Sequence, residues 1–148
     1  MEDAASITSF KVAGEFFCFE TTKIRHILEM TAPTPVPLSK DYILGVVNNH
    51  GNMTPVVDFR KIIGVSAEEN LPEASIVVVA VDDSNESLIG FKVDEVDEVF
   101  ATDNYNMSPE VVFEIDKTVQ KALCGTYHIG EKFIYKVNLE ELAKVIEQ

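Results

Sequence analysis

The sequence predicts a mainly β fold, built as a barrel or sandwich, with a short helix in the middle and a second helix at the C-terminus. Valine, isoleucine and phenylalanine recur in short runs, and glycine, asparagine, aspartate or proline interrupt these runs. The interrupting residues favour turns, so the runs read as strands. With 148 residues, of which 46% are hydrophobic, the chain is expected to form a single domain over residues 1–148.

The first expected elements are a hairpin and a third strand. Residues 6–12 and 16–20 are apolar runs on either side of an Ala-Gly turn. Residues 23–29 are assigned to a strand, although the spacing of their apolar side chains also fits a helical turn. Residues 30–40 contain three prolines, which lack a backbone donor, so this segment is expected to be an extended connection.

A second hairpin is expected over residues 45–59, "GVVNNHGNMTPVVDF", where two apolar runs turn around Asn-Asn-His-Gly-Asn. Asp58 can cap a short helix that follows, and Gly64 can end that helix in a left-handed conformation. A polar connection then covers the middle of the chain. We expect the chain to cross between two halves of the domain near residues 66–75.

The remaining elements are two strands, a hairpin and a helix. Residues 76–81 and 88–93 form the two strands, and the second can continue to residue 100. Residues 102–109 are expected to be loop. The last hairpin pairs residues 122–128 with 133–137. Asn138 then caps a terminal helix, with Glu141 three residues later as its capping-box partner.

Composition excludes several function classes. The formal net charge is -13 with only 12 Lys and Arg, and such a field repels the phosphates of nucleic acids. An oligonucleotide-binding barrel would need a basic groove with exposed aromatic side chains, and the chain has no tryptophan. No apolar run approaches the roughly 20 residues of a membrane-spanning helix, and no secretory signal is visible, so a cytoplasmic protein is expected. Cys18 and Cys124 are expected to be buried, reduced thiols.

No pattern of catalytic residues is evident. The sequence has no Gly-x-Ser-x-Gly elbow and no glycine-rich phosphate loop. His26, His50 and His128 lack metal-ligand spacing, but adjacent strands can bring His26 and His50 together, with Asp58 or Asp41 as a third ligand. A small metal-dependent hydrolase therefore remains an alternative. Local signals favour His50 as a solvated turn residue beside a glycine with positive φ.

The acidic segment 94–98 alternates carboxylates with apolar residues. Paired carboxylates can perform general acid-base catalysis. The alternation is more typical of a strand that exposes its polar edge to water, which is the interpretation we favour. The same segment can also bind a basic partner without any catalysis.

Residues 42–64, "YILGVVNNHGNMTPVVDFRKIIG", resemble the signature hairpin of the CheW-like chemotaxis coupling domain, whose pattern is Ile-x-Gly-Val-x-Asn-Leu-Arg-Gly-x-x-x-Pro-Val-Val-Asp-Leu-Arg. The residues that match in register are Ile43, Gly45, Val46, Asn48, Gly51, Pro55, Val56, Val57, Asp58 and Arg60. The stretches "FKVAGEFFCFETTKIRHILEM", "LIGFKVDEVDEVF" and "GTYHIGEKFIYKVNLEELAKV" are similar to other parts of the same family. The resemblance extends over nearly the whole chain.

This resemblance implies two packed five-stranded SH3-like β-barrels with a short middle helix and a C-terminal helix. It also implies a non-catalytic adaptor without a cofactor. Proteins of this family link the cytoplasmic tips of chemoreceptors to the regulatory domain of a chemotaxis histidine kinase, and a groove near the barrel junction takes the receptor. We therefore expect a cytoplasmic protein that is recruited to membrane-bound receptor arrays. A diverged interaction module outside chemotaxis is the alternative within the same fold.

The chain departs from the family pattern at the hairpin turn. The family usually has Leu-Arg in place of Asn49-His50, and its arginine commonly pairs with a glutamate on the strand that His26 matches. Histidine lacks the permanent charge and five-donor fork of arginine, so the usual ion pair cannot form. The receptor-facing residues that the resemblance implies are Ile24, His26, Gly45, Asn48, His50, Gly51, Gly90 and Val96. Phe59 and Ile62 are expected in the core, and we assign no kinase-facing, catalytic or metal-binding residue.

Overall fold

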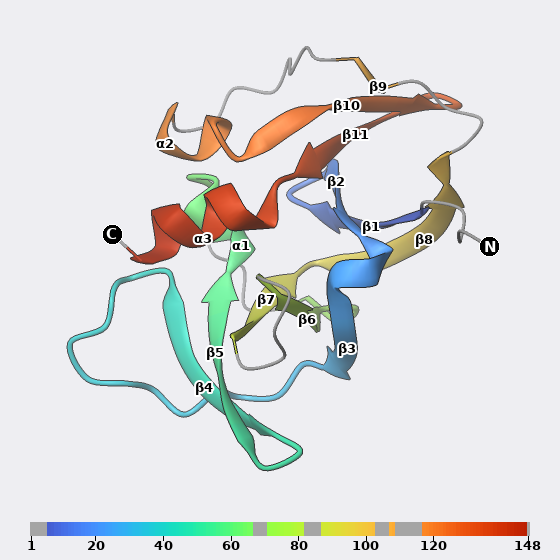
Figure 1. The fold of residues 1–148 in the computed structure, drawn as a ribbon. Helices are drawn as coiled ribbons and strands as arrows, with labels where there is room; N and C mark the ends of the chain where they lie inside the picture. Colours follow the sequence, from blue (N-terminus) through green and yellow to red (C-terminus); the bar gives the residue numbers. More distant parts are fainter. Residues whose placement is uncertain (1–5, 67–70, 82–86, 103–106, 109–116, 148) are drawn as a thin grey trace.

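The computed structural model describes residues 6–66, 71–81, 87–102, 107–108 and 117–147, and these fold into two β-sheets with short helices (Figure 1). The first sheet has six strands in the order β8-β1-β2-β11-β10-β9. Its strands are β1 (Ser6–Val12), β2 (Glu15–Glu20), β8 (Glu95–Ala101), β9 (Met107–Ser108), β10 (Leu123–Ile129) and β11 (Lys132–Val137). Neighbouring strands are antiparallel, except that β2 and β11 run parallel.

The second sheet has five strands in the order β3-β6-β7-β5-β4. Its strands are β3 (Ile24–Glu29), β4 (Ile43–Asn49), β5 (Asn52–Asp58), β6 (Ser75–Ala80) and β7 (Leu88–Val93). Here β5 and β7 form the parallel pair. The mainly β fold class, both of the first two hairpins and the β10–β11 hairpin are confirmed. Residues 107–108, expected in a loop, instead form the edge strand β9.

The helices are short. They are the 3-10 turn η1 (Thr21–Lys23), α1 (Phe59–Ile62), α2 (Lys117–Gln120) and α3 (Leu139–Glu147). The side chain of Asp58 accepts a hydrogen bond from the N–H of Arg60, and that of Asn138 accepts one from the N–H of Glu141, so both predicted caps are confirmed. The carboxylate of Glu141 binds Lys144. No helix in the described part of the chain is long and apolar enough to span a membrane.

The two sheets repeat one arrangement of strands. Across each sheet, the edge strand (β3 or β8) is followed by an antiparallel pair (β6–β7 or β1–β2). The next strand (β5 or β11) runs parallel to that pair's second strand and forms a hairpin with the strand after it (β4 or β10). Gly45 and Gly125 each lie at a register shift of the hairpin with φ between +144° and +154°. Asp58 and Asn138 follow these glycines at the same interval, and each caps the helix that comes next.

The equivalent halves are not arranged one after the other along the chain. Strands β3 to β7 are inserted between β2 and β8, so the chain passes between the sheets at η1 and again at Asp94. The crossover was expected near residues 66–75, but these residues join α1 to β6, which both adjoin the five-stranded sheet. The expected continuation of the strand 88–93 to Phe100 also ends at Asp94, because the chain changes sheets there.

Asp94, where the chain returns to the six-stranded sheet, links α1 to the turn between β1 and β2. Its carboxylate accepts two hydrogen bonds from the guanidinium of Arg60 on α1, at 2.8 and 2.6 Å. It also accepts one from the N–H of Ala13, in the turn between β1 and β2, at 2.8 Å. The expected solvated acidic edge is therefore wrong at Asp94, and also at Asp97, which binds Lys132 and Ser9. The local alternation of charge gave no sign of these distant partners.

The largest hydrophobic cluster, the main core, takes residues from both sheets and from α1, α2 and α3. Five phenylalanines lie within it in ring contact, Phe10, Phe17, Phe19, Phe59 and Phe91, and the Phe10 and Phe59 ring centroids are 5.2 Å apart in an edge-to-face arrangement. Burial of such side chains stabilises a fold by about 1.5–3 kcal/mol each. The core positions predicted for Phe59 and Ile62 are confirmed. Two smaller clusters, one on each sheet, complete the interior.

Candidate functional site

The turn between β4 and β5 brings His50 against His26 of β3. Their ring centroids are 5.1 Å apart, the planes are tilted by 43°, and both residues are exposed. Strands β3 and β4 are the two edges of the five-stranded sheet. Thr34, in the connection after β3, also forms a bridge with Val46 of β4. The sheet is therefore curved so that its edges approach each other, and the histidine pair lies where they meet.

Local sequence explains the shape of this turn. His50 and Gly51 have φ of 52° and 87°, the left-handed pair of a two-residue hairpin. Among residues with a side chain, histidine and asparagine are the types that adopt this conformation most readily. The N–H of Gly51 donates to Oδ1 of Asn48 at 2.8 Å, which fixes the turn. The positive φ predicted for Gly51 is confirmed.

The eight residues implied to face a receptor occupy three environments. His26, Asn48, His50 and Gly51 are exposed together, and with Met53 we name them the hairpin-tip surface. Gly45 and Gly90 are buried: a Cβ at Gly45 would overlap the carbonyl group of Thr34, and one at Gly90 would lie 2.7 Å from a methyl carbon of Ile76. Ile24 and Val96 are half-buried against the main core. The structure therefore brings four of the eight together at one exposed place.

Sequence reasoning missed Met53, whose side chain is 62% exposed. Met53 lies opposite Asn48 across the hairpin, so the two side chains are on the same face of the sheet. With residues 50 and 51 as the turn, counting outward along both strands pairs residue 49 with 52 and residue 48 with 53, which would have placed Met53 beside Asn48. An exposed methionine is a flexible apolar contact that suits protein partners.

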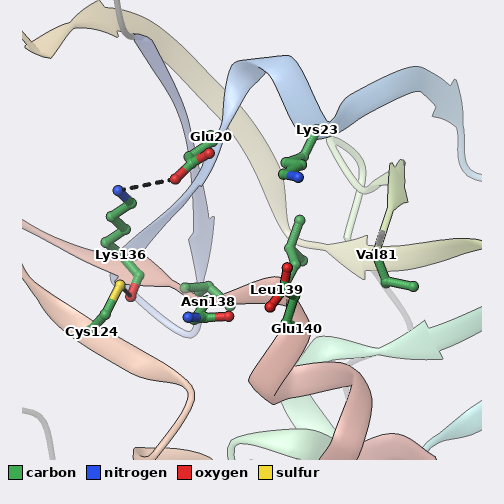
Figure 2. Close-up of a pocket in the computed structure, with 9 residues that line it drawn as sticks. Glu20, Lys23, Val81, Cys124, Lys136, Asn138, Leu139 and Glu140 are labelled. Carbon is green, nitrogen blue, oxygen red and sulfur yellow. Dashed lines mark hydrogen bonds and ion pairs between the residues drawn. The ribbon is translucent and has the colours of Figure 1, made fainter. Parts of the chain in front are cut away.

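A pocket of about 310 Å³ opens where the two sheets meet (Figure 2). It is lined by Glu20, Lys23, Val81, Cys124, Lys136, Val137, Asn138, Leu139 and Glu140. An ion pair of 3.3 Å joins Lys136 to Glu20, and the Cys124 thiol donates to the carbonyl oxygen of Lys136 at 3.6 Å. Burial by itself lowers the pKa of Lys136, but Tyr127, Glu20 and Cys124 raise it overall. The ammonium group therefore stays charged beside its carboxylate.

A second pocket, of about 320 Å³, is mainly apolar and shares Val81 with the first. Its lining residues are Ile43, Pro55, Val57, Val81, Ser87, Leu88, Ile89 and Ile146. Val81 lines both pockets, and we name the two pockets together the junction groove, with a charged half in the first pocket and an apolar half in the second. None of the eight implied receptor-facing residues lines it.

The cysteines differ from each other. Both are free, and Cys18 is buried as expected, but Cys124 is exposed. Cys124 is the extra residue at the register shift of β10, which breaks the strict alternation of faces along the strand, and its side chain lines the first pocket instead of the core. Burial raises the pKa of both thiols. Neither thiol is therefore activated as a nucleophile.

The metal-dependent alternative needs a third ligand beside His26 and His50. Asp58 is buried as the cap of α1, and Asp41 pairs with Lys61. Within the described ranges, no group of three or more histidine, cysteine, aspartate or glutamate side chains is placed to hold a metal ion. The two aspartates proposed as third ligands are thus engaged elsewhere.

The sequence is similar to a known family model and to known proteins over most of its length. The model of the CheW-like domain matches residues 6–147. The chain is 30% identical to the chemotaxis protein CheW of Rhizobium meliloti (strain 1021) over 138 residues, which cover 92% of this chain and 85% of that protein. It is 34% identical over 90 residues to the CheW of Thermotoga maritima, which cover 61% and 57% of the two chains.

A solved structure has the same fold. The scaffolding protein TtCheW from Thermoanaerobacter tengcongensis superposes with a TM-score of 0.76 at 23% identity, and covers 91% of this chain and 89% of its own. The family match spans all of the described residues, and the R. meliloti relative matches over most of its own length. The chain therefore belongs to the CheW-like domain family.

Proposed function

We propose that the protein is a non-catalytic adaptor in chemotaxis signalling, which couples chemoreceptors to a chemotaxis histidine kinase. The observation that carries this proposal is the CheW-like match over residues 6–147. The relatives are named chemotaxis proteins, and the matching solved structure is named a scaffolding protein. In this role the protein works in the cytoplasm without a cofactor, as a single domain of two barrel-like halves, and is recruited to membrane-bound receptor arrays.

The cytoplasmic tip of a receptor is the partner that we assign to the hairpin-tip surface. His26, Asn48 and His50 offer exposed polar groups, and Met53 offers an apolar one, which is the usual mixture of an interface rim and its anchor. Gly45 and Gly90 contribute indirectly, because larger side chains there would displace the hairpin. Ile24, on the same strand as His26, and Val96, on β8 of the other sheet, pack against the main core.

The junction groove is a second region suited to a helical partner. Its apolar half can bury one face of an amphipathic helix, and Lys23, Lys136 and Glu20 in its charged half can set the orientation of that helix.

The regulatory domain of the kinase is the other expected partner. Its docking residues on this chain are not assigned.

The adaptor role is tested by binding measurements with two purified partners from the same cell, the kinase regulatory domain and a receptor cytoplasmic fragment. We expect the chain to bind each partner and to raise the amount of kinase recovered with the receptor. A chain that binds neither partner would contradict the proposal and favour an interaction module outside chemotaxis.

The receptor-facing assignment has its own test. Met53→Glu places a charge on the hairpin-tip surface and should weaken receptor binding by about tenfold or more. Val99→Glu is the matched control, because Val99 is also 62% exposed but lies on β8 of the other sheet. Equal effects of the two substitutions on receptor affinity would show that the hairpin-tip surface is not the contact.

A further inference from the structure

We propose that His26 and His50 together bind one divalent first-row transition-metal ion, such as Zn²⁺, Ni²⁺ or Cu²⁺. The two imidazoles come from opposite edges of the five-stranded sheet and meet at the hairpin tip. This inference stands on their geometry alone and does not depend on the adaptor role. From the sequence we assign no metal-binding residue and keep these two histidines only as ligands of an alternative hydrolase, whereas this inference needs neither a third protein ligand nor catalysis.

The distance between the rings fits a shared ion. A histidine nitrogen binds zinc at about 2.0–2.1 Å, and a ring nitrogen lies about 1.1 Å from its ring centroid. Two imidazoles on one tetrahedral ion therefore have centroids about 5 Å apart. The observed separation of 5.1 Å matches this value. Ring packing without a metal also occurs at such distances, so the experiment must distinguish the two.

The backbone positions of both histidines are fixed before any ion arrives. His26 lies in β3, where it pairs with Val78 of β6 across a ladder. His50 is fixed by the turn that Asn48 closes through its hydrogen bond to Gly51. Such preorganisation reduces the entropy lost when two side chains converge on one ion.

The surroundings favour a cation of this class. Both histidines are exposed, so an ion can enter, keep bound water and accept a further ligand. The formal net charge of -13 attracts cations to the molecule. Imidazole nitrogen suits zinc, nickel and copper, whereas calcium and magnesium prefer oxygen ligands. With two protein ligands, the ion would exchange readily and retain coordination positions for water or for a side chain of a partner.

The experiment is a titration of the full chain, free of any affinity tag, with Zn²⁺ and Ni²⁺ by isothermal calorimetry. We expect one ion to bind per chain. His26→Gln and His50→Asn should each weaken binding by about tenfold or more, since each removes a direct ligand. Asparagine is used at position 50 because it tolerates positive φ.

Two control variants separate this site from other donors. His128→Gln removes the remaining histidine, which is exposed but packs against Phe133, with ring centroids 4.7 Å apart. Cys124→Ser removes the exposed thiol. Both variants should keep the affinity of the parent chain, and thermal unfolding without metal should show that all four variants fold.

A spectroscopic readout identifies the ligands directly. Zn²⁺ should shift the side-chain ¹⁵N resonances of His26 and His50 and leave those of His128 unchanged. The proposal is overturned if no saturable binding is seen, which would leave ring packing as the reason for the contact. It is equally overturned if binding survives in both His26→Gln and His50→Asn, or is lost in either control.

Discussion

Asp94 offers the sharpest test of how the two sheets are held together. Asp94→Asn keeps the size of the side chain and one acceptor for the N–H of Ala13, but removes the charge that faces Arg60. The side chains of Arg60 and Asp94 are only 15% and 12% exposed. Breaking a fully buried pair costs about 3–5 kcal/mol, and a hydrogen bond to a charged group contributes about 1.5–3 kcal/mol. Because this pair is partly solvated, we expect a loss of about 2–4 kcal/mol in the free energy of unfolding.

Equilibrium unfolding in urea measures this loss, and the melting temperature should fall by about 5–15 °C. Asp41→Asn is the matched control, since Asp41 also pairs with a cation, Lys61, but is 89% exposed. The control should change stability by less than about 0.5 kcal/mol. A double-mutant cycle with Arg60→Met should give a coupling energy of about 2 kcal/mol. Similar losses in Asp94→Asn and Asp41→Asn would refute the reasoning.

Three further predictions concern single residues. Gly45→Ala should lower the free energy of unfolding, measured in urea, by more than about 2 kcal/mol, because the added Cβ would overlap a backbone carbonyl. Gly14→Ala is the control: Gly14 has open space around it, so the substitution should cost only about 1 kcal/mol in the same experiment. The reaction of Cys124 with iodoacetamide should have a pH midpoint above 9.0, the ordinary pKa of a cysteine thiol, because burial raises the pKa of Cys124. Cys18 is buried and should stay unlabelled. A midpoint at or below 9.0 would contradict this prediction. Asn49→Leu should raise the free energy of unfolding by about 1–2 kcal/mol, because Asn49 is buried and its Oδ1 has no hydrogen-bond partner among the described residues. A lower free energy of unfolding in this variant would contradict the prediction.

Local patterns predicted most elements, because hairpins and caps are encoded by neighbours in sequence. The turn at His50 and Gly51 and the caps at Asp58 and Asn138 needed only a few adjacent residues. Which sheet a strand joins depends on pairings between distant segments. The parallel pairs β2–β11 and β5–β7 leave no local signal, so the insertion of one half into the other was missed.

At the hairpin-tip surface, too, the sequence predicted local features better than contacts between distant residues. The contact of His26 with His50 was expected only on the condition that their strands lie side by side, and the curvature of the five-stranded sheet meets that condition. Four of the eight implied residues are buried or half-buried, which a family pattern read from the sequence alone does not reveal. The pairing of Met53 with Asn48 across the two-residue turn would have found Met53.

The insertion of one half within the other also determines the order in which the protein can be completed during synthesis. All five strands of the inserted sheet, from Ile24 to Val93, leave the ribosome as one continuous stretch and can pair at once. Strand β2 emerges earlier but must wait for β11, more than a hundred residues later, and its edge stays open to other chains during that interval. Until the last hairpin is translated, the open edge of β2 is therefore a place where the nascent chain can pair with other chains.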